Sequence, residues 1–132
     1  MPASTARQLR CLIIDDSPQF LAAARRLLQQ EGITVVGVGA SGRDAVRLAL
    51  ELRPDVTLVD IDLGEEDGVA LTRRLAQLED GPAGKLILIS THGDDEFADL
   101  IEASLEIGFV PKSTLSARAI YALTGADWDR IP

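Results

Sequence analysis

The sequence predicts an α/β fold, a doubly wound five-stranded parallel sheet of the (βα)5 type, and three observations support it. Five short apolar runs alternate with five segments whose apolar residues recur at helical spacing. Such alternation is typical of parallel strands joined by right-handed crossover helices. The chain has 132 residues, the length of one domain, and 46% of them are hydrophobic, enough for a buried core.

The first strand–helix unit begins after residues 1–9, which we expect to be a flexible lead-in. Residues 11–14 form a continuous apolar run that ends at two aspartates. Ser17 is a favoured N-cap and Pro18 a favoured first helical residue, so a helix should begin there and end near Gly32. Its apolar face comprises Phe20, Ala24, Leu27 and Leu28.

The second unit combines a strand over residues 34–38 with a helix capped by Ser41. That helix should end before Pro54, because the residue preceding a proline disfavours helical geometry. A third strand then covers residues 56–59 and ends at Asp60. The inner face of the second helix comprises Ala45, Leu48, Ala49 and Leu52.

The third unit continues through a loop over residues 61–67 to a helix that starts at Gly68. Residues 79–84 are a loop by composition, and residues 85–89 form the most hydrophobic strand. The inner face of this third helix comprises Leu71, Leu75 and Leu78.

The last two units follow a polar loop over residues 91–95. Gly108 should end the fourth helix, and residues 109–110 should form a short last strand. A final helix should run from Ser113 or Thr114 to Leu123. The domain then covers residues 10–124, with a short tail over residues 125–132. The apolar face of the fourth helix comprises Phe97, Leu100, Ile101, Ser104 and Leu105.

Charge and composition exclude several functions. The net charge of −8 at pH 7 argues against a nucleic-acid surface and against binding to anionic membranes. The single cysteine, Cys11, excludes an internal disulfide and is expected to act as a small buried hydrophobe. No run approaches a membrane span, and the first ten residues lack the apolar core of a signal peptide. We therefore expect a cytoplasmic protein.

Polar side chains follow four of the predicted strands: Asp15 and Asp16, then Asp60, Ser90 and Lys112. The carboxyl ends of parallel strands share one edge of the sheet. Crowded carboxylates repel one another, and hard oxygen ligands suit Mg²⁺. With a lysine and a hydroxyl added, the set fits a site where a phosphoryl group is transferred to an aspartate. Singly, each residue could also be a turn, cap or surface residue.

Four segments, LIIDDSP, PDVTLVDIDLGEEDG, LILIST and GFVPKS, carry a family resemblance along nearly the whole chain. Their order and spacing resemble the receiver (response-regulator, CheY-like) domain of two-component signalling. The resemblance implies a flavodoxin-like sheet with strand order 2-1-3-4-5. It also implies that Asp60 is the phosphoacceptor, served by a sensor histidine kinase or a phosphotransfer protein. Ser90 would bond a phosphoryl oxygen, and Lys112 would pair with the acyl phosphate.

The same resemblance implies a Mg²⁺ site and a switch. Asp15, Asp16 and Asp60, with the backbone carbonyl of Asp62, would hold the ion. Phe109 takes the family's switch-aromatic position, and its ring would turn inward as the serine moves. The face of the fourth helix, fifth strand and fifth helix would then bind a downstream protein partner, and the chain would be a monomer or a phosphorylation-dependent dimer. Acidic residues favour a basic partner there: Asp94, Asp95, Glu96, Asp99, Glu102 and Glu106.

Several positions depart from the family pattern. Gly64 replaces the usual proline after the phosphoacceptor, which predicts a looser loop. Thr91 replaces an alanine and could restrict access of a phosphodonor. In the family, the peptide bond after this lysine is usually cis and commonly leads to a proline. Here Ser113 follows, so the bond after Lys112 is either strained or trans. Asp62 and His92 flank the expected path of a hydrolysing water, and we predict that they tune the lifetime of the phosphorylated state; for His92, an exposed loop residue is an equal alternative.

Other functions stay open at this point. Asp60-Ile61-Asp62 after a buried strand also resembles the haloacid-dehalogenase Mg²⁺ phosphatases, but in those enzymes the motif lies on the first strand. A flavodoxin-like cofactor domain needs a phosphate loop after the first strand, where two aspartates would repel the phosphate. A degenerate receiver that only docks partners is the third alternative. We expect no enzyme beyond self-phosphorylation and dephosphorylation, and either a stand-alone receiver or part of a longer regulator.

Overall fold

The structure, a computed structural model, describes residues 8–91 and 107–124. Its main sheet has the strand order β2-β1-β3-β6-β7, and every neighbouring pair is parallel. Counted along this sheet alone, the order is 2-1-3-4-5, so the predicted fold and topology are confirmed. The strands are β1 (Arg10–Ile14), β2 (Thr34–Gly39), β3 (Val56–Asp60), β6 (Lys85–Ser90) and β7 (Ile107–Pro111).

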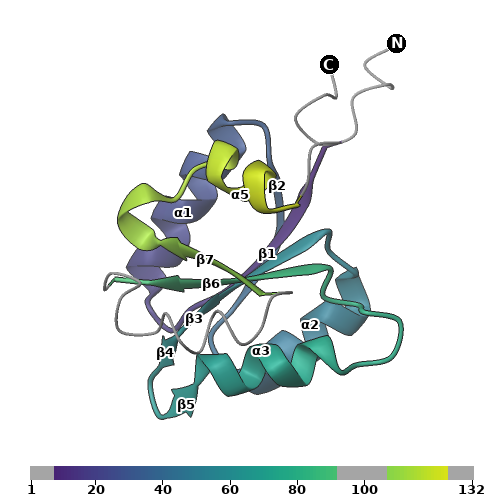
Figure 1. The fold of residues 1–132 in the computed structure, drawn as a ribbon. Coiled ribbons are helices and arrows are strands. Elements are labelled where there is room, and N and C mark those ends of the chain that lie inside the picture. The colour runs from purple at the N-terminus through teal and green to yellow at the C-terminus, as the bar shows by residue number, and fades with distance from the viewer. Residues whose placement is uncertain (1–7, 92–106, 125–132) are drawn as a thin grey trace.

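Helices cover both faces of the sheet (Figure 1). One layer holds α1 (Pro18–Gln30) and α5 (Ala117–Thr124), and the other holds α2 (Gly42–Leu52) and α3 (Gly68–Ala76). The strand side chains alternate between two apolar clusters, one under each layer. Both faces of the sheet are therefore buried, as parallel sheets require. Within the described residues, no helix is long and apolar enough to cross a membrane.

The helix boundaries follow the predicted local signals. Ser17 Oγ accepts a hydrogen bond from the Phe20 N–H at 3.2 Å, and Ser41 Oγ accepts one from Asp44 N–H at 3.2 Å. The first helix stops before a glycine with φ of 95°, and the second before Arg53 with φ of 46°. Left-handed geometry at both stops ends the helix and turns the chain back toward the sheet.

The last strand is longer than predicted. It begins at Ile107, and Gly108 lies within it instead of ending a helix. A Cβ on Gly108 would stand 2.9 Å from Leu123 Cδ1 of α5, so the missing side chain lets that helix approach the strand closely. The predicted fourth helix falls in residues 92–106, outside the described residues.

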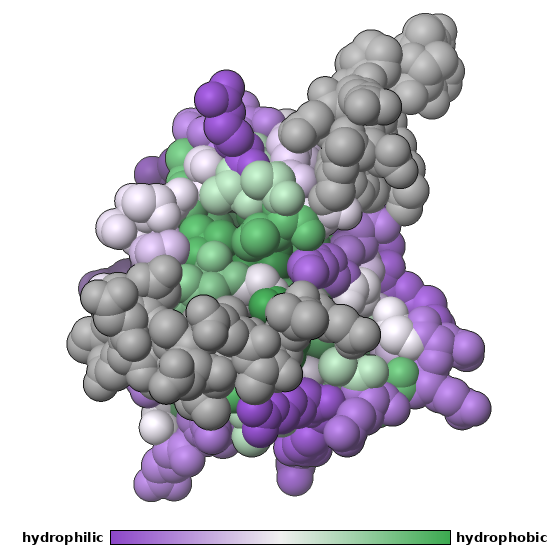
Figure 2. Space-filling view, viewed as in Figure 1, coloured by the Kyte–Doolittle hydropathy of each residue, from purple (hydrophilic) through white to green (hydrophobic). Residues whose placement is uncertain are grey.

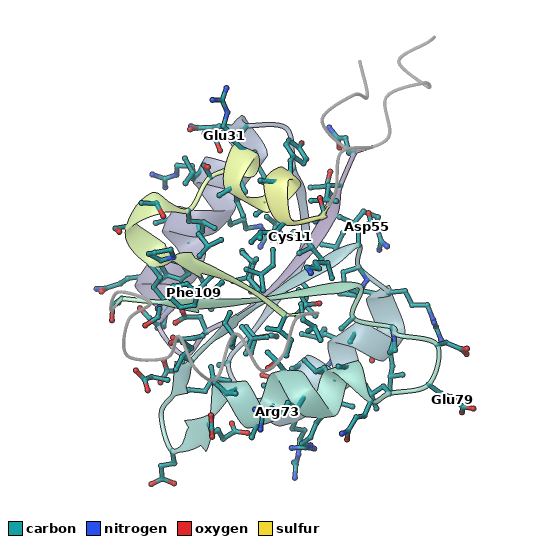
Figure 3. The ribbon with its side chains drawn as sticks, viewed as in Figure 1. Cys11, Glu31, Asp55, Arg73, Glu79 and Phe109 are labelled. Carbon is teal, nitrogen blue, oxygen red and sulfur yellow. The ribbon has the colours of Figure 1, made fainter. Side chains whose placement is uncertain are left out.

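The final helix starts later than predicted. Residues 112–114 form a 3-10 helix, and α5 begins at Ala117. The carboxylate of Glu31, at the end of α1, accepts a hydrogen bond from the Ala117 N–H at 2.7 Å (Figure 3). The carboxylate that caps the start of α5 therefore comes from the end of another helix. No local sequence pattern could have predicted where α5 begins.

The segment over residues 61–67 is not a plain loop. It contains a two-stranded antiparallel hairpin of β4 (Asp62–Leu63) and β5 (Glu66–Asp67). Glu66 accepts a hydrogen bond from the Gly42 N–H, with both carboxylate oxygens at 3.0 Å, and so ties the hairpin to the start of α2. The helix that follows ends at Ala76, so Leu78, predicted on its inner face, lies beyond it and is half-buried.

Candidate functional site

Three aspartates gather where β1 and β3 end. Asp15 and Asp16 follow β1, and Asp60 is the last residue of β3. Each offers a carboxylate oxygen, and these three oxygens lie within 4.8 Å of one another. Asp15 is fully buried, Asp60 is 6% exposed, and Asp16 is exposed. The parallel topology thus brings together the carboxylates that the sequence places at neighbouring strand ends.

A lysine that follows the edge strand β7 enters this cluster. Lys112, directly after β7, places its Nζ 2.6 Å from Asp15 Oδ2 and 3.5 Å from Asp60 Oδ2. The contact with Asp15 is an ion pair without hydrogen-bond geometry, and Asp15 Oδ2 accepts no hydrogen bond from the described residues. One ammonium group therefore forms ion pairs with two buried carboxylates, and Asp15 Oδ2 still accepts no hydrogen bond from the described residues.

Backbone amides fix the other oxygen of each buried carboxylate. Asp15 Oδ1 accepts a hydrogen bond from the Ser17 N–H at 2.8 Å, and Asp60 Oδ1 accepts one from the Asp62 N–H at 3.2 Å. Both Oδ1 atoms are thus held by the amide two residues further along the chain. Both Oδ2 atoms are left to face Lys112.

The cluster makes Asp60 hard to ionise. Burial, and secondarily the negative charge of Asp15, raise the pKa of Asp60 to about 6. The Asp62 N–H and Lys112 act in the opposite direction but do not cancel these effects. At neutral pH the folded protein therefore holds a carboxylate whose charge is only partly compensated.

We expect Asp60→Asn to stabilise the protein at pH 7.5 by about 1–2 kcal/mol in the absence of divalent ions. Because the pKa of Asp60 is raised on folding, wild-type stability falls as pH rises from about 4, the unfolded value, to about 6. Asparagine carries no charge at any pH, so the advantage should shrink toward pH 4. Urea denaturation at both pH values measures it.

Asp44→Asn is the matched control with the opposite sign. A hydrogen bond from the Ala40 N–H lowers the pKa of Asp44, so this carboxylate is stabilising when ionised. Its replacement should slightly destabilise the protein at pH 7.5 and have less effect at pH 4. An Asp60→Asn variant no more stable than wild type at pH 7.5 would contradict the charge argument.

The remaining predicted residues differ in how deeply they are buried. Ser90 ends β6 and is buried, whereas Thr91 beyond it is exposed. Phe109 lies on β7 (Figure 3), half-buried and packed against the apolar cluster under α2 and α3. Asp62 has an exposed side chain. His92 lies outside the described residues.

The departures from the family pattern have a structural setting. Gly64 has φ of 62°, which proline cannot adopt, and a Cβ there would stand 3.3 Å from Asp16 Oδ2. Gly64 lies in the turn of the hairpin described above, between β4 and β5. No described peptide bond is cis, so the bond from Lys112 to Ser113 is trans.

The donor set fits a hard divalent cation. All three aspartates offer carboxylate oxygens, which are the ligands that Mg²⁺ prefers. Within the described residues, Lys112 alone forms an ion pair with these carboxylates. A cation beside Asp15 Oδ2 would balance more of their charge and use the oxygen that accepts no hydrogen bond.

Comparison with known proteins finds one matching family over most of this chain. The response regulator receiver domain family matches residues 11–122. The protein-glutamate methylesterase/protein-glutamine glutaminase of Alkalilimnicola ehrlichii is 35% identical over 106 residues, which cover 80% of this chain but 27% of that protein. This chain therefore spans about a quarter of that relative.

Solved structures agree with the sequence comparison. A LuxR-family two-component response regulator from Aurantimonas superposes with a TM-score of 0.77 at 28% identity and covers 95% of both chains. The signal receiver domain of a modulated diguanylate cyclase from Desulfovibrio desulfuricans has a TM-score of 0.71 at 33% identity, over 89% of this chain and 90% of that one.

Proposed function

The chain belongs to the response regulator receiver domain family, and we propose that it is a phosphorylation switch in which Asp60 is the phosphoacceptor. The observation that carries this proposal is the setting of Asp60. Its carboxylate is almost buried at a strand end, 3.5 Å from Lys112 Nζ and beside two further aspartates. The donor would be a sensor histidine kinase or a phosphotransfer protein.

In the proposed reaction, Asp60 Oδ2 attacks the phosphorus of the donor. The bond from phosphorus to the donor atom breaks, that atom keeps the electron pair, and an acyl phosphate forms on Asp60. Lys112 neutralises charge on the phosphoryl group, and Ser90 bonds one of its oxygens. Such transfer depends mainly on positioning and charge, and this site is built for both.

Asp15, Asp16, Asp60 and the backbone carbonyl of Asp62 would hold Mg²⁺, which supplies positive charge to the phosphoryl oxygens. Asp15 is preorganised for this role because the Ser17 N–H fixes its other oxygen at 2.8 Å. We further propose that Asp62 and His92 set the lifetime of the acyl phosphate.

The proposed output is a change on the face that the family resemblance assigns to the predicted fourth helix, the last strand β7 and the last helix α5. New charge on Asp60 would draw Ser90 and Lys112 inward and let the ring of Phe109 follow. Figure 2 shows hydrophobic side chains gathered beside α5 on this side of the molecule. A downstream protein partner, or a second copy of the chain in the phosphorylated state, would bind there.

We expect one phosphoryl adduct when the protein is incubated with acetyl phosphate and Mg²⁺, read by intact-mass spectrometry. The adduct should be absent with EDTA and in Asp60→Asn, because each removes a component of the site. Asp44→Asn, which changes a half-buried aspartate on α2, should keep the adduct.

A wild type that takes no phosphoryl group from acetyl phosphate or from a cognate kinase would overturn the proposal. It would support the alternative of a receiver that only docks partners. The retained Asp15, Asp60 and Lys112 contacts favour phosphorylation over that alternative. Membership of the receiver family argues against the haloacid-dehalogenase alternative.

A further inference from the structure

The aromatic ring of Phe20 lies against the ammonium group of Lys112. Nζ is 4.3 Å from the ring centroid, within the range of a cation–π contact. Phe20 lies in the first turn of α1, where its helical spacing predicts a core residue. It does pack against the core cluster under α1 and α5, but it is only half-buried there.

The backbone of Phe20 is hydrogen-bonded to the loop that carries the aspartates. The Phe20 N–H donates to Ser17 Oγ at 3.2 Å, and the Ser17 N–H donates to Asp15 Oδ1 at 2.8 Å. The N-cap of α1 thus links the backbone amide of Phe20 to the buried carboxylate of Asp15. A shift of Phe20 relative to Asp15 would break one of these bonds.

Three groups now determine where the ammonium lies. Asp15 Oδ2 is nearest at 2.6 Å, Asp60 Oδ2 lies at 3.5 Å, and the Phe20 ring lies at 4.3 Å. The side chain of Lys112 is only 12% exposed, so the ring replaces water that would otherwise solvate the charge. Without the ring, water can enter, and the closer and more deeply buried Asp15 becomes the dominant partner.

We propose that Phe20 is a positioning residue that holds the Lys112 ammonium within reach of the Asp60 carboxylate. This inference rests on the proposed function, because it concerns the same phosphoacceptor site. The face of the ring stabilises the cation while leaving its N–H groups free for oxygen acceptors. Lys112 can therefore turn from Asp60 Oδ2 to a phosphoryl oxygen without being released to solvent.

The test compares Phe20→Leu with Phe20→Tyr in the full chain. Leucine keeps an apolar side chain but has no π face, whereas tyrosine keeps the ring. We expect Phe20→Leu to slow Mg²⁺-dependent phosphorylation by acetyl phosphate by about 3- to 30-fold, the range of such contacts. Phe20→Tyr should keep most of the wild-type phosphorylation rate. Leu21→Ala, which alters a neighbouring α1 side chain packed on the same cluster, should leave the rate unchanged.

An NMR measurement distinguishes the contact between the Phe20 ring and Lys112 from a general packing effect of the Phe20 side chain. The Lys112 Hε protons should be shifted upfield by the ring in the wild type and in Phe20→Tyr, and lose that shift in Phe20→Leu. Equal rates in wild type and Phe20→Leu, or equal slowing by leucine and tyrosine, would overturn this inference while leaving the proposed function standing. A wild type without any adduct would instead refute the proposed function and this role with it.

Discussion

Lys112→Met is expected to destabilise the protein by about 3 kcal/mol at pH 7.5 without divalent ions. Methionine keeps the apolar stem of the side chain and removes the charge. The substitution leaves Asp15, which is fully buried, without its ion-pair partner at 2.6 Å, and Asp60 without the one at 3.5 Å. Breaking a buried ion pair from one side typically costs about 3–5 kcal/mol, and protonation of a carboxylate relieves part of it. Urea denaturation measures the loss.

The pH dependence and Mg²⁺ identify the cause of that loss. Without Lys112 the pKa of Asp60 rises further, so the loss should be larger at pH 7.5 than at pH 5. Added Mg²⁺ should recover part of it if the ion enters the cluster, because a ligand that binds the folded state stabilises it. Lys85→Met, at the opposite edge of the sheet and half-buried, should cost less. A small, pH-independent loss in Lys112→Met would contradict the account.

The topology explains why so much of the site could be predicted from sequence. Asp15, Asp60, Ser90 and Lys112 each end or directly follow a different strand, and parallel pairing alone brings those four strand ends to one edge. Helix starts at Ser17 and Ser41 depend on residues within three positions of the cap. Signals of this kind are local, or they depend on the order of strands, and both can be read from the chain.

The features that sequence could not reveal depend on side chains from distant segments. Glu31 caps α5 from the end of α1, and Glu66 caps α2 from the hairpin after β3. Phe20 matches the apolar stripe of its helix, yet its ring also contacts Lys112, which directly follows the last strand. Helical spacing states which face a residue lies on, but at the first turn of α1 that face meets both the core and the strand ends.

Gly68→Ala is expected to destabilise the protein by about 3 kcal/mol and to disturb the site. Gly68 is the first residue of α3, and an ideal Cβ there would lie 2.0 Å from the backbone oxygen of Asp60. It would also lie 2.8 Å from Ile61 Cα, so only backbone can move to make room. Such overpacking typically costs about 1–3 kcal/mol, occasionally more, and a backbone clash belongs at the upper end. The displaced group is the peptide of the proposed phosphoacceptor, so the phosphorylation yield should fall as well.

The sign of the stability change in Gly68→Ala distinguishes the steric contact with Asp60 from the effect of helix propensity. Alanine is favoured over glycine in helices, by up to about 1 kcal/mol, so without the contact Gly68→Ala would stabilise the protein. Gly81→Ala is the matched control, because Gly81 has φ of 52° and nothing within 4 Å of its Cβ position. It should cost about 1–2 kcal/mol for backbone conformation alone and leave phosphorylation unchanged. A Gly68→Ala protein as stable as wild type, with a full phosphoryl adduct, would show that α3 can begin without this close approach to Asp60.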